Sequence, residues 1–155
     1  MLDNLATVPH AHGRPSGAAV KAAVRGNRTL GYRPAMNLYP GTPYDYSAAA
    51  QGLVFTAGAC PLDEEGTVVA PGDYEAQALR AVENLLAALA RHAAGPESLL
   101  KTTVFVVARE RSDLVKVWDV VSSRLGRAPS TLLGVSLLGY TGQVVEIEAV
   151  ATVGA

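Results

Sequence analysis

The sequence has little cysteine, histidine, aromatic residue or charge. Of its 155 residues one is cysteine, Cys60, three are histidine and 17% are charged. A single cysteine excludes an internal disulfide and favours a reducing compartment, so we expect a cytoplasmic protein. His10 and His12 have no further ligand types beside them, and no metal site is predicted.

Long apolar runs and a net charge are also missing. No apolar segment approaches the roughly 18 residues of a membrane span. The formal net charge of −1 gives no reason to expect nucleic acid as a partner. We therefore expect neither a membrane nor a nucleic acid to be bound. The chain is long enough to bury a core as one domain without a disulfide or a metal.

Residues 1–35 differ in composition from the rest of the chain. They hold five of the 13 basic residues but only one of the 14 acidic residues, Asp3. Glycine and proline recur there without a sustained apolar period, which predicts a flexible basic extension. The folded domain is expected over residues 36–155. Because Met36 directly precedes the apolar, strand-like segments, we hypothesise that Met36 is the natural start and that the extension is dispensable.

The segment from Val144 to Val153 has the clearest pattern. Its residues alternate at period two, as in a β-strand with one buried face. Glu146 and Glu148 lie on the second face. They are plain solvated charges if that face meets water. If the face lines a cleft, one of them is a candidate acid or base.

The rest of the chain predicts an α+β fold, a mixed six-stranded sheet with two helices on one face. One helix is expected between an Asp73 cap and Gly95-Pro96, and one between a Ser112 cap and Gly126, with Trp118 in the core. Apolar residues on both faces of the strand at 99–108 suggest that another subunit covers the sheet. The six strands are expected at 46–50, 53–57, 67–69, 99–108, 130–138 and 144–153.

Three segments, YSAAAQGLVFTAGACPLDEEGTVV, LLKTTVFVVA and VVEIEAVA, resemble motifs of the RidA/YjgF family of reactive-intermediate deaminases. The resemblance covers about Met36 to Val153. It implies a chorismate-mutase-like fold assembled as a homotrimer, with clefts between neighbouring subunits. It also implies hydrolysis of reactive enamines and imines to carbonyl compounds and ammonia, without a cofactor.

The resemblance assigns roles to single residues. Glu146 matches the glutamate that helps hold the attacking water, and Tyr46 or Tyr44 matches a pocket tyrosine. The family arginine that grips the substrate carboxylate is missing, because no residue from 128 to 143 is basic. The substrate-binding residues that the resemblance implies are Tyr46, Tyr44, Gly58, Cys60, Ser112, Ser130 and Thr131, with Ser130 or Thr131 where the arginine belongs.

The missing arginine leaves two classes of function open. A bidentate arginine orients a carboxylate and balances its charge, and serine cannot replace it. The chain is therefore expected to hydrolyse imines or enamines, on a substrate outside the family norm. The alternative is a non-catalytic trimeric binder of a small metabolite. Cys60 is expected to be a pocket-lining thiol rather than a nucleophile, since no neighbouring group in the sequence would lower its pKa.

Overall fold

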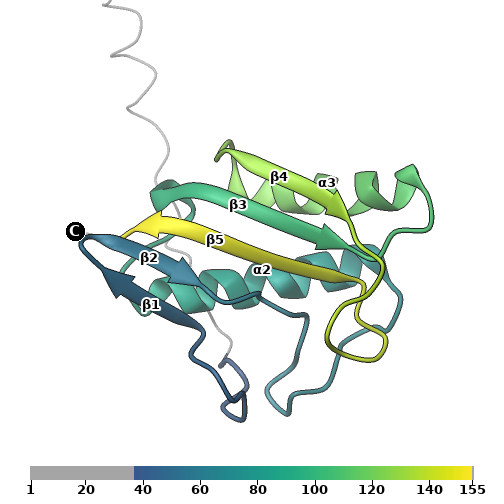
Figure 1. The fold of residues 1–155 in the computed structure, drawn as a ribbon, viewed down its shortest axis with the longest axis horizontal. Coiled ribbons are helices and arrows are strands. Elements are labelled where there is room, and N and C mark those ends of the chain that lie inside the picture. The colour runs from purple at the N-terminus through teal and green to yellow at the C-terminus, as the bar shows by residue number, and fades with distance from the viewer. Residues whose placement is uncertain (1–36, 155) are drawn as a thin grey trace, which may run out of the picture. The chain divides into compact units, whose positions relative to one another are not determined.

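The computed structural model describes residues 37–154. The predicted extension at 1–35, and Met36 after it, lie outside the described residues. Figure 1 shows the elements, which in chain order are β1 (Ser47–Ala50), β2 (Leu53–Thr56), α2 (Tyr74–Ala90), a 3-10 turn (Pro96–Ser98), β3 (Leu99–Val106), α3 (Arg111–Leu125), β4 (Ser130–Gly134) and β5 (Val145–Thr152).

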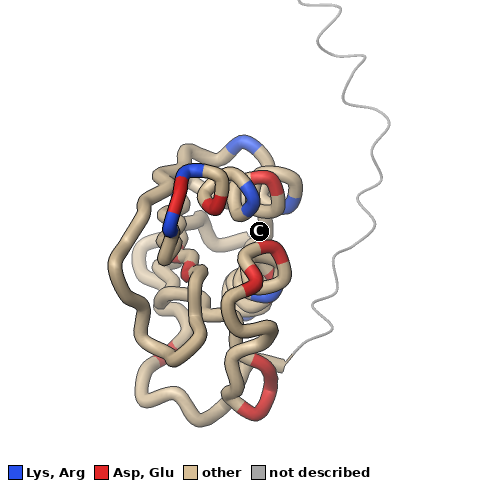
Figure 2. The backbone as a smooth tube through the Cα atoms, turned by 90° about the vertical axis from the view of Figure 1, so that its right-hand side faces the viewer, with Lys and Arg blue, Asp and Glu red and all other residues tan. Residues whose placement is uncertain are grey.

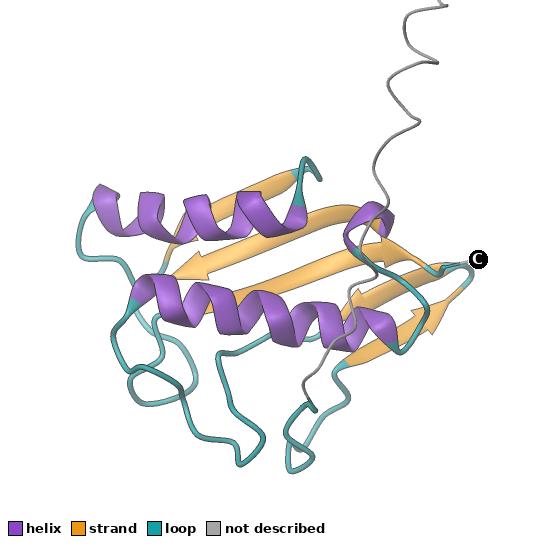
Figure 3. Ribbon diagram, turned by 180° about the vertical axis from the view of Figure 1, so that it is seen from behind, coloured by secondary structure: helices purple, strands orange, loops and turns teal. Residues whose placement is uncertain are grey.

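The strands form one mixed sheet in the order β1-β2-β5-β3-β4 (Figure 1). All neighbouring pairs are antiparallel except β3 and β4, which are parallel and are connected by α3. Both helices cover the same face of the sheet (Figure 3). The predicted α+β class, with a mixed sheet and two helices on one face, is confirmed.

Strand β5 lies between β2 and β3, and its alternation confirms the pattern in the sequence. Its helix-facing residues are almost completely buried, and they are Val145, Ile147, Ala149 and Ala151. Glu146 and Glu148 lie on the opposite face, where their partners on β3 are Phe105 and Thr103.

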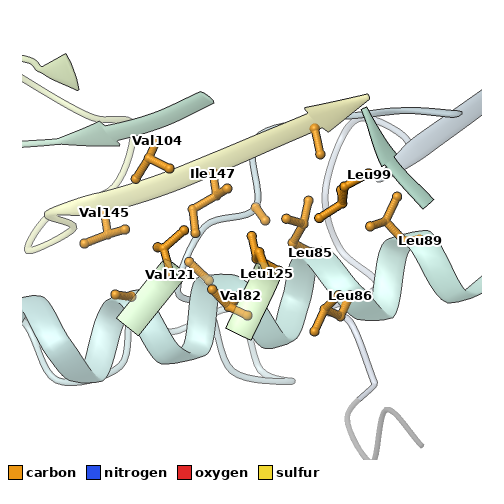
Figure 4. Packing of buried hydrophobic residues seen from close by; sticks show 14 of the residues in the cluster. Val82, Leu85, Leu86, Leu89, Leu99, Val104, Val121, Leu125, Val145 and Ile147 are labelled. Carbon is orange, nitrogen blue, oxygen red and sulfur yellow. The ribbon is translucent and has the colours of Figure 1, made fainter. Parts of the chain in front are cut away.

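The core lies between this sheet and the two helices (Figure 4). Leu85 and Leu89 of α2 pack with Val104 of β3 and Ile147 of β5, and all four are fully buried. Burying such aliphatic side chains contributes roughly 1.5–3 kcal/mol each, which anchors β5 and hence the position of Glu146.

The sheet has five strands within the described residues, so the prediction of six is wrong. Residues 67–69 make only an isolated bridge, Val68 to Leu62. The side chain of Asp63 accepts hydrogen bonds from the backbone N–H groups of Glu65 (3.1 Å) and Thr67 (2.8 Å). This tight turn folds the segment back on its own neighbours, away from the sheet.

The helix caps are partly as predicted. Asp73 caps α2 by accepting from the N–H groups of Glu75 (3.1 Å) and Ala76 (3.0 Å), but the helix ends at Ala90, before Gly95. Ser112 does not cap α3. The cap position belongs to Glu110, and Asp113 accepts from the N–H groups that precede the helix.

The prediction that Trp118 is a core residue is also wrong. Its side chain is 36% exposed, whereas Val117, Val121 and Leu125 form the buried stripe of α3. Trp118 lies toward the edge of the sheet, where it lines a shallow hollow with Ala128 of the following loop.

The sheet face opposite the helices is left open in a single chain. It carries Phe55 of β2, which is 50% exposed, and Leu133 of β4, which is 40% exposed. Val150 of β5 pairs with Phe55, and Phe105 of β3 pairs with Leu133, so these four residues extend across the sheet. We call them the open-face apolar residues. Among the described helices, none is both long and apolar enough to cross a membrane.

Candidate active site

A pocket of about 440 Å³ opens beside the start of β5. It is built from the segment before β1, the segment after β2, the loop before β5 and β5 itself. Its lining residues are Tyr44, Ala57, Gly58, Cys60, Gly139, Tyr140 and Glu146. Four of the predicted site residues are thus brought together: Tyr44, Gly58, Cys60 and Glu146.

A short backbone bridge holds the segment after β2 against β5. The N–H of Ala59 donates to the carbonyl of Ile147 at 2.7 Å, and the N–H of Ile147 donates back to Ala59 at 3.2 Å. Since side chains alternate along a strand, Gly58 and Cys60, on either side of Ala59, share the pocket face with Glu146. The Glu146 side chain extends along this face until its carboxylate lies against Gly58.

The Glu146 carboxylate is held by two donors. Nε2 of Gln143 lies 3.0 Å from its Oε2, and Sγ of Cys60 lies 3.5 Å from the same oxygen. Gln143 is only 4% exposed and also bonds the backbone, donating to the Val145 carbonyl (3.1 Å) and accepting from the Tyr140 N–H (3.1 Å). A buried side chain with three such bonds has little freedom, so it fixes the carboxylate.

Oε1 of Glu146 lies against Gly58. A Cβ at position 58 would overlap Oε1, and it would also crowd Cδ and Cγ of Glu146. Glycine at position 58 thus allows the Glu146 carboxylate to approach the backbone closely, and its own backbone is not in the left-handed region. The fit leaves Oε1 as the carboxylate oxygen whose acceptor positions can serve a ligand.

Cys60 is a protonated thiol in this setting. It is 8% exposed, and burial, followed by the negative charge of Glu146, raises its pKa to about 12. Because the thiolate is the reactive form, a thiol so shifted is a poor nucleophile at neutral pH. Its role in the pocket is to donate its single S–H, for which the Glu146 carboxylate at 3.5 Å and the Gly58 carbonyl at 3.7 Å are the two acceptors within reach.

The two candidate tyrosines occupy different places. Tyr44 lines the pocket, and burial together with a hydrogen bond to the Tyr140 side chain raises the pKa of its hydroxyl. Tyr46 contacts Tyr44 edge to face at 6.2 Å, but its hydroxyl donates to the Tyr39 carbonyl at 2.7 Å. The Arg91 guanidinium lies 5.6 Å from the Tyr46 ring centroid. Tyr46 therefore packs against Tyr44 without lining the pocket itself.

Besides Tyr46, three further predicted residues do not line this pocket within one chain. Ser112 is exposed near the start of α3 and donates to Glu110 at 2.6 Å. Ser130 accepts from Thr102 at 2.8 Å on the helix side of β4. Thr131 is on the open face, where it accepts from Lys101. Their roles in substrate binding stay predictions.

Another cavity, of about 480 Å³, lies at the start of α3. Two of its charged residues are paired: Lys116 binds Asp113 at 3.1 Å, and the Lys116 ammonium lies 5.6 Å from the ring centroid of Tyr74. Asp113 is occupied by two backbone N–H groups as well. These contacts stabilise the start of α3 beside the cavity.

Sequence reasoning missed Gln143 and Tyr140. Both lie in the turn before β5, which reads as a plain loop because of Gly139 and Gly142. A signal was present in the spacing of Gln143, three residues before Glu146. Only the fold shows that the turn brings its amide back onto the carboxylate.

The fold and this glutamate-bearing pocket define a class of small α+β proteins. The family model described as endoribonuclease L-PSP matches residues 35–153, and the chain belongs to this family, which is the RidA/YjgF family.

Individual relatives are consistent with this family membership. A RutC family protein of Pyrococcus abyssi is 28% identical over 110 residues, covering 70% of this chain and 85% of the relative. A Rid family protein of Yersinia pestis has a TM-score of 0.65 at 26% identity, covering 72% and 88% of the two chains. Escherichia coli TdcF with bound serine has a TM-score of 0.61 at 24% identity over the same shares, and shows similarity of fold.

Proposed function

We propose that this protein hydrolyses small reactive imines and enamines to carbonyl compounds and ammonia, with Glu146 as the catalytic residue. One observation carries the proposal. The Glu146 carboxylate, which lines the pocket, is fixed by Gln143 and Cys60 on one oxygen while its other oxygen lies beside Gly58. A positioned carboxylate of this kind can accept and return protons during addition of water.

The reaction balances with this single group. The substrate reacts as the protonated imine: the water oxygen bonds to its carbon, the π pair moves to nitrogen, and Glu146 takes a water proton. Returning that proton to nitrogen gives a carbinolamine whose protonated nitrogen is a good leaving group. The C–N bond then breaks, ammonia leaves, the hydroxyl proton passes to Glu146 as the carbonyl forms, and Glu146 hands that proton to ammonia to give ammonium. An enamine enters the same route once a proton on carbon has converted it to the imine.

Assembly as a homotrimer is part of this proposal. The open-face apolar residues Phe55, Phe105, Leu133 and Val150 need cover, and a second copy of the sheet would provide it. A neighbouring copy could also bring Ser112, Ser130 or Thr131 toward the pocket. The cleft would then be completed between subunits, as the family resemblance implies.

A non-catalytic metabolite binder remains the alternative. The E. coli relative with bound serine is a member of this fold that holds a small molecule, which suits either function. A ribonuclease role has little support here. Basic and acidic residues are interspersed around α3 (Figure 2), and His92, the one histidine in the described part, is hydrogen-bonded to Ser47 at 2.9 Å.

The experiment is a hydrolysis assay on freshly generated imines, with and without the protein, following the carbonyl product. The proposal expects acceleration that disappears in Glu146→Gln while the oligomeric mass is unchanged. Glu148→Gln is the matched control, because Glu148 is a carboxylate of the same strand face outside the pocket. A properly assembled protein that accelerates no imine would favour the binder.

We place the activity in the cytoplasm, because a single free thiol is typical of a reducing compartment.

A further inference from the structure

The pocket has an unusual charge balance for a site expected to hold an anion. Of its lining residues, Glu146 is the one that carries charge, and it is negative. Two cations lie on neighbouring elements but have other contacts. Arg91 lies over Tyr46, and Lys101 donates to Thr131. The walls within one chain thus present a carboxylate and no balancing positive charge.

The aromatic residues of the pocket add to its negative electrostatic potential. Tyr44 and Tyr140 both line the pocket, and Tyr140 is close enough to contribute to the raised pKa of the Tyr44 hydroxyl. The faces of tyrosine rings carry negative potential and attract cations held near them. Because the pKa of the Tyr44 hydroxyl is raised, the phenol stays neutral and keeps the character of a neutral aromatic wall.

Glu146 is arranged to receive a donor. Its Oε2 already accepts from Gln143 and Cys60, and Oε1 lies beside Gly58. A carboxylate oxygen has two acceptor positions, so Oε1 can take an N–H from a ligand and a proton from water. An N–H that carries positive charge forms a shorter and stronger hydrogen bond with a carboxylate than a neutral one. A substrate carboxylate at the same place would meet like charge.

We infer that the preferred substrates are imines without an α-carboxylate, bound as iminium cations between Tyr44 and Tyr140 with their N–H on Oε1 of Glu146. This inference rests on the proposed function, because it names the substrate class of the same site. The chemistry is consistent, since a protonated imine is the form most easily attacked by water. One water and one iminium cation give one aldehyde or ketone and one ammonium ion, so the reaction is balanced.

The test uses two imines that differ only in the carboxylate. A flavin amine oxidase acting on 2-phenylethylamine supplies 2-phenylethan-1-imine, and a flavin amino-acid oxidase acting on phenylalanine supplies 2-imino-3-phenylpropanoate. We expect kcat/KM to be at least tenfold higher for the imine without the carboxylate. Glu146→Gln should remove this acceleration, and Glu148→Gln should leave it.

Binding provides a second measurement that does not depend on turnover. Calorimetry with 2-phenylethylammonium and with 3-phenylpropanoate compares a cation and an anion of similar size. The cation should bind at least tenfold more tightly, and Glu146→Gln should abolish that difference.

The outcomes separate the two proposals. Faster hydrolysis of 2-imino-3-phenylpropanoate, or tighter binding of 3-phenylpropanoate, would overturn the inference while the imine hydrolase stands, and would indicate a cation brought by a neighbouring copy. Acceleration of neither imine by an assembled protein would overturn both.

Discussion

Gln143 donates its side-chain amide to Oε2 of Glu146 at 3.0 Å, across the turn that leads into β5. The same amide holds the Val145 carbonyl, and its oxygen holds the Tyr140 N–H. One buried side chain therefore fixes the candidate catalytic carboxylate and the loop that carries an aromatic wall of the pocket.

Gln143→Met tests this positioning role. Methionine has a similar volume but offers no N–H donor, so Glu146 should lose its strongest fixed partner. We expect kcat to fall at least tenfold, with a smaller change in KM, measured well below the melting temperature.

Gln143→Glu separates positioning from packing in the same turn. It keeps the size and the backbone acceptor but places a second carboxylate beside Glu146, so activity should fall as well. Wild-type kcat in Gln143→Met would contradict the role.

Gly58→Ala should damage the pocket by contact alone. Its Cβ would overlap Oε1 of Glu146, which must then turn away from the ligand position. We expect at least a tenfold loss of kcat/KM, with the fold retained as judged by circular dichroism. Gly134→Ala is the control, because a Cβ there meets nothing within 4 Å and activity should be unchanged. Equal effects of the two substitutions would refute the contact argument.

Cys60 should behave as a buried, protonated thiol. Its pKa is raised to about 12, first by burial and then by Glu146, so little thiolate exists near pH 7. Alkylation by iodoacetamide should be slow at pH 7 and rise steadily as the pH increases toward 12. Glu146→Gln removes a negative neighbour and should make alkylation faster at every pH in that range.

Activity provides the second readout on the same residue. Cys60→Ala should keep measurable turnover, since the thiol only donates a hydrogen bond. Complete loss of turnover in a folded Cys60→Ala variant would make the residue a nucleophile and would require a different mechanism.

The open face of the sheet should be an interface between copies. Light scattering should give a mass three times the 16.1 kDa of the chain. Phe55→Lys places a charge among the open-face apolar residues and should shift the mass toward the monomer. Val115→Lys, at a similarly exposed position on α3, should not. A monomeric wild-type protein would remove the proposed assembly.

The sequence predicted those features that depend on local periodicity. The alternation in β5 placed Ile147 inward and Glu146 outward, and Asp73 marked the start of α2, because both signals act over a few residues. Features set by tertiary contacts were harder to predict. Residues 67–69 have strand-like composition, yet the Asp63 turn pairs them locally. Ser112 resembles a cap, but the helix begins at Arg111 and the cap position belongs to Glu110, two residues before Ser112.

The candidate site likewise contains residues that could be predicted from the sequence and one that depends on tertiary structure. Glu146, Gly58, Cys60 and Tyr44 come from segments about 90 residues apart, and the family resemblance brought them together before the structure did. Gln143 was missed because its meaning depends on the path of the turn from Gly139 to Gly142. The spacing of three residues between Gln143 and Glu146 allows a contact, but only the folded turn shows that the amide reaches the carboxylate.

The most direct test of Glu146 as the catalytic residue is the rate of 2-phenylethan-1-imine hydrolysis by wild-type protein, Glu146→Gln and Glu148→Gln, with oligomeric mass measured on the same samples. We predict clear acceleration by the wild type and by Glu148→Gln, and none by Glu146→Gln, at equal mass. Acceleration that survives in Glu146→Gln would contradict this role, because the reaction would then proceed without the carboxylate around which the pocket is built.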